Sequence, residues 1–258
     1  SGKAALSRPA HQRVTLTVGC IKRRFRKTMS TPQARVAVTM ATEWAIRRPY
    51  VFRYMPKVYV DAFFSDGILR LSSFSAFSKH KDEQRLDKNE GTGILVNTDD
   101  EGTGQTVFAV MGQGHDAFVL CGSVRYGNDL AEAFSTDSGF RINDPTAFGC
   151  MIAQALPGFR AGLEGACIYV DRKTVNRKAG KLDLESMRIS PDKNELDMGK
   201  MFSAIFGMAG DDLFFLKNMQ YQHQAEYRLL WSVAHDITDF VEVKCPDATQ
   251  FCTRFEDL

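Results

Sequence analysis

The sequence contains no long apolar run. None of its apolar stretches approaches the roughly 20 residues that a membrane-spanning helix needs. The first residues also lack the charged-then-apolar order of a signal peptide. We therefore expect no association with a membrane and an action in the cytoplasm, either the protein's own or that of a target cell. The opening Ser1-Gly2 is typical of residues left by tag removal, which leaves open whether further sequence precedes it.

Cysteine is also scarce for a chain of this length. There is no Cys-x-x-Cys pair and no histidine at ligand spacing from a cysteine, so we predict no metal site. A chain of 258 residues can bury a sizeable core without disulfide bonds. We therefore expect free thiols in a reducing compartment at all six positions, which are Cys20, Cys121, Cys150, Cys167, Cys245 and Cys252.

The formal net charge of only +2 excludes a generally basic or acidic protein. The charge is unevenly placed, because residues 21–27 hold five cations in seven positions. Such a run can contact phosphates or an acidic partner, although most are solvated arms. Hydrophobic residues make up 44% of the chain and charged residues 25%, values typical of a folded globular protein.

Two regions differ in pattern. Residues 1–48 form a basic N-terminal arm followed by a predicted helix, which begins at Thr31-Pro32 and ends before Pro49. Residues 49–258 alternate between short apolar runs and turn residues, and we interpret them as one domain.

This second region begins with a predicted strand, helix and strand. An aromatic and β-branched run over 50–55 stops at Pro56, a helix follows as far as Gly67, and a second strand covers 68–74. Many short strands and few helices follow, which predicts the α+β class. The strands are expected around 117–121, 140–142, 165–170 and 240–244, and the helices around 128–134, 143–156 and 198–208, the last with Met201, Ile205 and Met208 as its buried stripe. A polar connector or hairpin tip is expected over 171–181.

Glycine-rich repeats lie between these elements. The tetrapeptide Glu-Gly-Thr-Gly at 90–93 recurs at 101–104, but neither copy has the third glycine and the strand-to-helix context of a dinucleotide fingerprint. We interpret both as hairpin turns, which argues against a Rossmann fold. The polar loop before them, 81–91, could display Arg85, Asp87 or Glu90 toward a ligand, or be a solvated loop.

The most informative stretch is 222–233, where a polar segment leads into an apolar strand. Glu226 stands at this junction. Gln224, two residues earlier, is expected in the same pleat register, so Gln224 and Glu226 would point to the same face and could reach one ligand. The alternative is that Glu226 and Arg228 form an exposed ion pair on an edge strand.

Three segments together resemble the ADP-ribosyltransferase superfamily, nearest to its diverged bacterial and phage branches. They are Phe52-Arg53-Tyr54 on an early strand, Leu71-Ser72-Ser73-Phe74 with Phe77 close behind, and the late segment 224–228. The resemblance covers roughly residues 50–91 and 213–233. It implies a split β-sheet core with short flanking helices and NAD as the co-substrate.

The resemblance also implies roles for individual residues. Glu226, with Gln224 in the first acidic position of the family's Glu-x-Glu, would be catalytic; glutamine there implies acceptors other than arginine. Arg53 and Tyr54 are adjacent on a strand and face opposite sides, so only one can face the NAD. The implied NAD-binding residues are Arg53, Tyr54, Ser72, Ser73, Phe77, Arg85 and Glu90.

The activity implied by the resemblance is that of a mono-ADP-ribosyltransferase acting as a toxin, an effector or a defence enzyme. The acceptor would be RNA, DNA or a protein, and an immunity or antitoxin protein is a further expected partner. Two alternatives remain open. One is a non-catalytic module that binds a nucleotide or a partner, and the other is an NAD glycohydrolase.

Overall fold

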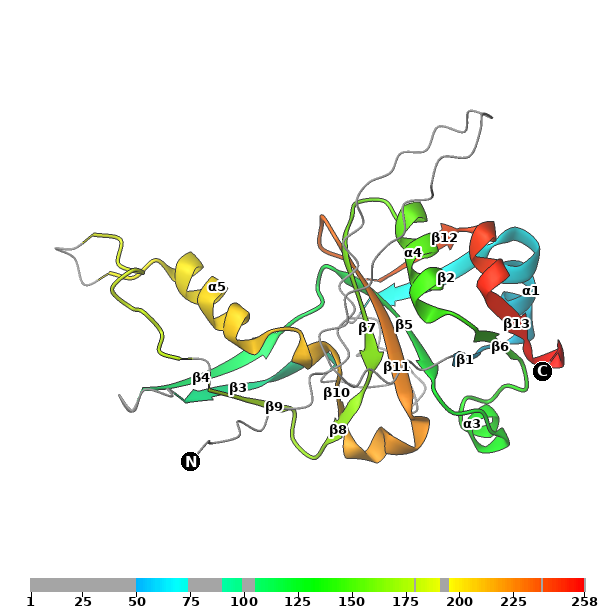
Figure 1. Ribbon diagram of the computed structural model, residues 1–258, viewed down its shortest axis with the longest axis horizontal. Coiled ribbons are helices and arrows are strands. Elements are labelled where there is room, and N and C mark those ends of the chain that lie inside the picture. Colours follow the sequence, from blue (N-terminus) through cyan, green and yellow to red (C-terminus); the bar gives the residue numbers. More distant parts are fainter. Residues whose placement is uncertain are drawn as a thin grey trace, which may run out of the picture. The chain divides into compact units, whose positions relative to one another are not determined.

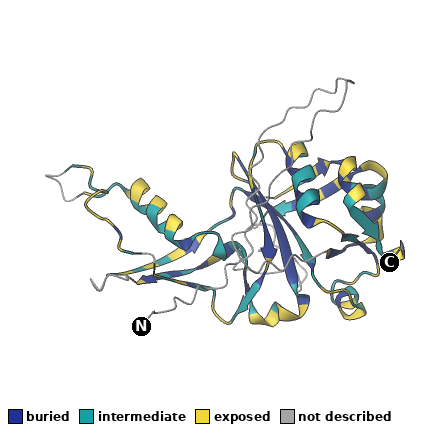
Figure 2. Cartoon of the chain, in the orientation of Figure 1, coloured by how far each residue is buried: buried dark blue, intermediate teal, exposed yellow. Residues whose placement is uncertain are grey.

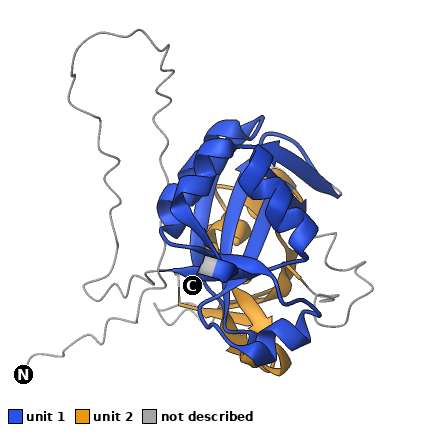
Figure 3. Ribbon diagram, turned by 90° about the vertical axis from the view of Figure 1, so that its right-hand side faces the viewer, with its two compact units in different colours: residues 1–76, 116–167, 224–258 blue, residues 77–115, 168–223 orange. Residues whose placement is uncertain are grey.

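The computed structural model describes residues 50–73, 90–98, 105–178, 180–190, 195–237 and 239–257. The arm and helix predicted over 1–48 lie outside the described residues, as do Phe77 and Arg85. The chain falls into two compact units, coloured separately in Figure 3. Unit 1 comprises residues 1–76, 116–167 and 224–258, and unit 2 comprises residues 77–115 and 168–223.

Unit 1 is built on a β-sheet in which every pair of neighbouring strands is antiparallel. Together with short helices, this sheet confirms the α+β class (Figure 1). Its strands are β1 (Val51–Tyr54), β2 (Ile68–Ser73), β5 (Ala117–Ser123), β6 (Gly139–Ile142), β7 (Phe159–Ala166), β11 (Glu226–Val233), β12 (Phe240–Lys244) and β13 (Cys252–Arg254).

The sheet forks at β5. On one side β5 pairs with β11 along its whole length. On the other side its beginning pairs with β2, through Ser72↔Val119 and Ser73↔Phe118, and its end pairs with β1, through Phe52↔Ser123. Beyond the fork, β12 continues the β2 branch, whereas β6 and β13 continue the β1 branch.

Three helical segments pack against one face of this sheet. They are α1 (Lys57–Asp66), α4 (Pro145–Ala155) and the 3-10 helix η3 (Pro246–Phe251). Alternate residues of β11, from Tyr227 to Val233, point into this core, and Trp231 donates a hydrogen bond from Nε1 to the Gly149 carbonyl at 2.9 Å. β5 and β11 are the most continuously buried strands of the sheet (Figure 2).

The ends of α1 and α4 lie where the sequence predicts them. Gly67 ends α1 in the left-handed conformation with φ 70°, and its N–H bonds the Phe63 carbonyl at 2.9 Å. Asp144 caps α4 by accepting the Ala147 N–H at 3.0 Å, with Pro145 in the first turn.

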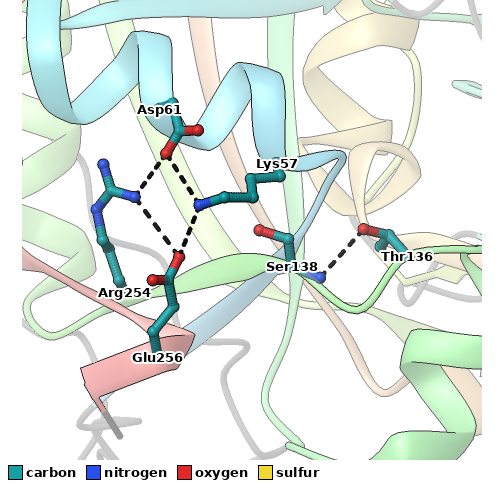
Figure 4. A network of polar contacts seen from close by, with 6 residues as sticks. All are labelled: Lys57, Asp61, Thr136, Ser138, Arg254 and Glu256. Atoms are coloured by element: carbon teal, nitrogen blue, oxygen red, sulfur yellow. Dashed lines mark hydrogen bonds and ion pairs between the residues drawn. The ribbon is translucent and has the colours of Figure 1, made fainter.

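An exposed ion-pair network joins α1 to the end of the chain (Figure 4). Asp61 accepts from Arg254 at 2.7 Å and from Lys57 at 3.4 Å, and Lys57 also contacts Glu256 at 3.1 Å. Nearby, the Ser138 N–H donates to the Thr136 hydroxyl oxygen at 3.2 Å. The network links two elements that are far apart in the sequence.

Unit 2 contains a three-stranded sheet in the order β4, β3, β9 and a separate parallel pair of strands. Its elements are β3 (Thr92–Thr98), β4 (Thr106–Gly112), β8 (Ile168–Val170), β9 (Thr174–Arg177), α5 (Met198–Ala209), η1 (Asp212–Phe214), β10 (Leu216–Asn218) and most of η2 (Met219–Gln224). Leu95, Met111, Val175, Ala209 and Leu213 form its core with Leu216.

Two predictions about unit 2 need correction. Residues 171–181 were expected to form a connector or hairpin tip, but they contain β9, which pairs with β3 in parallel. The stripe expected to be buried on α5 is only partly buried at Met201, Ile205 and Met208. Within α5, only the last residue, Ala209, is fully buried.

Candidate active site around Glu226

Glu226 is the first residue of β11, directly after a sharp change in chain direction. η2 ends at Gln224, and Ala225 adopts a left-handed conformation with φ 44°. The strand's pleat therefore does not extend back to Gln224, and the prediction that Gln224 and Glu226 share a pleat face is wrong. Gln224 is itself buried, with 3% of its surface exposed.

Backbone hydrogen bonds fix the start of β11 on both sides. The Val124 N–H donates to the Ala225 carbonyl at 2.9 Å, and the Cys167 N–H donates to the Glu226 carbonyl at 2.8 Å. β11 lies between β5 and β7, with Glu226 opposite Ser123. Glu226 consequently stands on an inner strand of the sheet.

The Glu226 carboxylate accepts a hydrogen bond from Arg228 Nε at 2.6 Å, and the Cys167 Sγ lies 3.6 Å from the same oxygen. Glu226 is 6% exposed and Arg228 1% exposed. The ion pair anticipated between these residues does form, but it is buried on an inner strand. Each charge offsets the desolvation cost of the other, because an isolated charge at such depth would be strongly unfavourable.

The carboxylate projects from the face of the sheet opposite the helix-packed core. Glu226, Arg228 and Leu230 alternate with core residues along β11, and the register places Phe52, Ser123 and Glu226 side by side on three consecutive strands. Ser123 also accepts the Arg125 N–H through its hydroxyl oxygen at 3.0 Å. A carboxylate, a hydroxyl and an aromatic ring thus follow one another along this row.

Arg53 lies at the fork of the sheet. Its side chain projects on the same face as Val51, a residue of the helix-packed core. Its Nη1 donates to the Cys121 carbonyl at 2.5 Å. Cys121 lies between the part of β5 that pairs with β2 and the part that pairs with β1, so Arg53 binds β5 where the two branches separate.

Tyr54 points to the opposite face from Arg53, as their adjacency on one strand predicts. Its ring lies in an aromatic cluster with Phe52, Phe134, Tyr126 and Phe255, and only 5% of the residue is exposed. The hydroxyl accepts the Gly127 N–H at 3.0 Å, and burial raises the pKa of Tyr54. These contacts make Tyr54 a packed residue that anchors the turn before α3 (Asn128–Ala133).

Ser72 and Ser73 lie near the opposite end of β5 from Glu226. They pair with Val119 and Phe118, which lie four and five residues before Ser123 along β5. At about 3.3 Å per residue, this separation exceeds 13 Å along the strand. The structure therefore does not bring the two serines together with Glu226.

Glu90 belongs to unit 2, in the turn before β3, whereas Glu226 belongs to unit 1. Within unit 1, two residues that were not predicted as site residues contact or adjoin Glu226, namely Ser123 and Cys167, whereas Arg228 was anticipated as its ion-pair partner. Residues 117–122 are a continuous run of apolar and small residues, so no pattern in the sequence indicates Ser123, and nothing in the sequence pairs Cys167 with Glu226.

Comparison of the chain with protein-family models, curated proteins and solved structures yields no match. The cysteines in the described part of the chain are free thiols, as predicted. No helix among the described residues has the length and apolar character to cross a membrane. In the same residues no three histidine, cysteine or acidic side chains gather as a metal-binding group.

Chemically, the Glu226 site offers a fixed anionic oxygen. The Arg228 guanidinium holds the carboxylate in place, and a carboxylate held in this way can stabilise a developing positive charge beside it. A carboxylate also accepts hydrogen bonds from sugar hydroxyls. These two capacities are those required to open a glycosidic or N-glycosidic bond through a cationic sugar.

Proposed function

We propose that the protein is an NAD-dependent mono-ADP-ribosyltransferase whose catalytic carboxylate is Glu226. The observation that carries this proposal is the position of Glu226, a buried and arginine-held carboxylate at the start of an inner strand, level with the end of β5 that pairs with β1. Of the two adjacent β1 residues in the resembling segment, Tyr54 projects from the same face of the sheet as Glu226, whereas Arg53 projects from the helix-packed face and binds the Cys121 carbonyl there.

In the proposed reaction, the bond between the nicotinamide nitrogen and ribose C1 of NAD breaks, and its electron pair leaves with nicotinamide. The ribose then carries oxocarbenium-like positive charge, which the Glu226 carboxylate stabilises. A nucleophilic oxygen or nitrogen of the acceptor forms the new bond to C1 and loses its proton. The products are neutral nicotinamide and an ADP-ribosylated acceptor.

Within this proposal, Arg228 is a positioning residue. It acts on the sugar only through Glu226, by holding the carboxylate ionised and in one orientation. Because Glu226 is only 6% exposed, the ribose can reach the carboxylate only when neighbouring groups move aside.

The first test is the release of nicotinamide from NAD by wild type, Glu226→Gln and a matched control, Glu164→Gln. Glu164 is 5% exposed and lies opposite Leu229, so it projects from the other face of the same sheet, where it accepts from the Thr146 hydroxyl. We expect Glu226→Gln to lose at least about 100-fold in rate, the size typical for one preorganised electrostatic group.

The control variant is expected to keep nicotinamide release close to that of wild type. Thermal unfolding would be measured for each variant, so that a loss of folding is not taken for a loss of catalysis. Equal losses of rate in both folded variants would contradict the assignment of Glu226.

A second candidate, the non-catalytic binding module, is favoured by the burial of Arg228. Arg228 is 1% exposed, and the Glu226 carboxylate offsets its buried charge whether or not Glu226 also acts on a ligand. If wild type binds NAD or a macromolecule but releases no nicotinamide, the protein is a binding module, and the role of Glu226 is to offset the buried charge of Arg228. Nicotinamide release without a modified acceptor would instead indicate an NAD glycohydrolase.

A further inference from the structure

A second functional feature lies on the same face of the unit 1 sheet as Glu226. The strand registers align Thr253, Arg141, Phe52, Ser123 and Glu226 as direct neighbours on β13, β6, β1, β5 and β11. Because direct neighbours in a sheet point to the same side, all five side chains project from one face. Arg141 is three strand spacings from Glu226, or about 14 Å.

Two exposed tyrosines flank this row at Phe52. The ring centroid of Tyr50 lies 5.4 Å from that of Phe52, and the centroid of Tyr126 lies 5.1 Å from it. Tyr50 is 40% exposed and Tyr126 52% exposed, whereas Phe52 between them is 6% exposed. Tyr126 is backed by Phe255 at 5.2 Å. The result is a supported aromatic surface that presents two rings to solvent.

A cation lies beside the aromatic surface. The Arg141 guanidinium carbon is 5.5 Å from the Tyr50 ring centroid, and its Nε donates to Asn143 Oδ1 at 2.7 Å. Asn143 in turn donates to the Thr253 hydroxyl at 2.9 Å. Among the described residues Arg141 forms no ion pair, in contrast to Arg125, which is bonded to Asp129 by two hydrogen bonds. The Arg141 charge is thus held by neutral groups next to a tyrosine face.

From this arrangement we infer that the surface formed by Tyr50, Tyr126 and Arg141 binds single-stranded nucleic acid. Tyrosine faces stack on unpaired bases whatever their sequence, and an arginine that lacks a carboxylate partner suits a phosphate. Two separate exposed rings suit successive bases of a strand better than the single adenine that NAD would offer beyond its nicotinamide. Phosphate contacts alone would supply affinity without sequence preference.

The inference rests on the proposed function only in naming the bound strand as the acceptor. A strand lying along the row would pass from Arg141 across Phe52 toward Glu226, where the reactive ribose of NAD would be attacked. The bound nucleotide nearest Glu226 would then supply the nucleophile. The binding surface itself is independent of whether Glu226 cleaves NAD.

The experiment is fluorescence-anisotropy binding of labelled 12-nucleotide single-stranded DNA and RNA of mixed sequence, with the full chain and without NAD. The test variants are Tyr50→Ala, Tyr126→Ala and Arg141→Gln. Two matched controls carry the same changes elsewhere in unit 1. Tyr59→Ala alters a tyrosine that is 51% exposed on α1, and Arg70→Gln alters an exposed arginine 3.4 Å from the Phe240 ring.

We expect each tyrosine variant to weaken binding about tenfold, within the range measured for stacked bases. Arg141→Gln should weaken binding about equally for all sequences and reduce the salt dependence by about one phosphate contact. Both controls should bind within about twofold of wild type, because surface changes away from the contacts have small effects.

Two results would overturn the inference. Equal binding by wild type and all three test variants would assign the affinity to another part of the chain, such as the cations at 21–27. If the test variants instead weaken binding of labelled NAD as much as that of the oligonucleotides, the surface serves the dinucleotide. If the test variants lose oligonucleotide binding but wild type releases no nicotinamide from NAD, the binding surface is upheld and only the transferase proposal is contradicted.

Discussion

At the scale of single residues, the central feature is the buried pair of Glu226 and Arg228. Their sequence spacing predicts neighbours on one face of a strand, and the pair forms at 2.6 Å. The spacing does not reveal depth, because burial depends on β5 and β7 lying on either side of β11. An exposed pair would contribute little to stability, whereas this one joins two charges that each need the other.

Replacing Arg228 with methionine should destabilise the protein by about 3 to 5 kcal/mol, because the Glu226 charge would remain buried without this partner. The double variant Glu226→Met/Arg228→Met should recover much of that loss, since no buried charge of the pair remains. Chemical denaturation of wild type, both single variants and the double variant gives the coupling energy. Additive losses would show that the two side chains do not depend on each other.

At the scale of secondary-structure elements, α1 is positioned by its C-terminal glycine. A Cβ on Gly67 would lie 2.2 Å from the backbone nitrogen of Pro246 and 2.4 Å from its Cα. The residue also has φ 70°, which side chains rarely adopt. Local sequence predicts the glycine as a helix stop, but the close approach of η3 follows only from the folded chain.

Gly67→Ala should therefore destabilise the protein by at least about 2 kcal/mol, through both left-handed strain and displacement of η3. Gly207→Ala is the matched control, because a Cβ there meets nothing within 4 Å and the residue lies inside α5. It should stabilise the protein by about 0.5 to 1 kcal/mol through helix propensity. Denaturant midpoints of the two variants test the prediction, and a loss for Gly67→Ala no larger than ordinary surface changes would contradict it.

The same helix is linked to the chain's end by the Asp61 network. The hydrogen bond from Arg254, followed by that from Lys57, holds the pKa of Asp61 below its usual value. A lowered pKa in the folded state gives stability that is present above the unfolded pKa, about 3.9, and is lost as pH falls through the folded value. The contribution is small, because the side chain is exposed.

Asp61→Asn should lower the melting temperature slightly at pH 7, and its difference from wild type should shrink steadily below about pH 4. Asp66→Asn, at the end of the same helix, serves as the control, since Asp66 forms no ion pair with the described residues and accepts only from Ser65. Thermal melts across pH 2 to 7 would check this. A constant difference at every pH would show that the network does not act through the charge of Asp61.

At the scale of the whole molecule, short sequence patterns predicted the helices and strands better than they predicted how distant strands pair. Proline, glycine and the capping aspartate located α1 and α4, and the β1, α1, β2 succession was confirmed. The fork at β5 and the parallel pairing of β9 with β3 join residues distant in sequence, and no local pattern encodes them. Gln224 was misplaced for a related reason, because the turn at Ala225 interrupts the expected pleat.

Of the candidate site, the sequence identified Glu226 and its strand, but it could not assemble the surroundings. Ser72 and Ser73 were grouped with Glu226 by motif order, yet they pair with the far part of β5. Ser123 and Cys167 come from strands that only the sheet register brings beside Glu226. Residues grouped by order along a chain need not be grouped in space.

The most direct test of Glu226 as a transferase carboxylate is the transfer of label from adenylate-labelled NAD to a cell extract by wild type, Glu226→Gln and Glu164→Gln. If Glu226 is the catalytic carboxylate and the acceptor is a nucleic acid, wild type and Glu164→Gln will give a labelled macromolecule and Glu226→Gln little or none. Nuclease, but not protease, will release the label. Label that only protease releases would contradict the nucleic-acid acceptor. If folded wild type gives neither labelled product nor free nicotinamide, the transferase itself is contradicted.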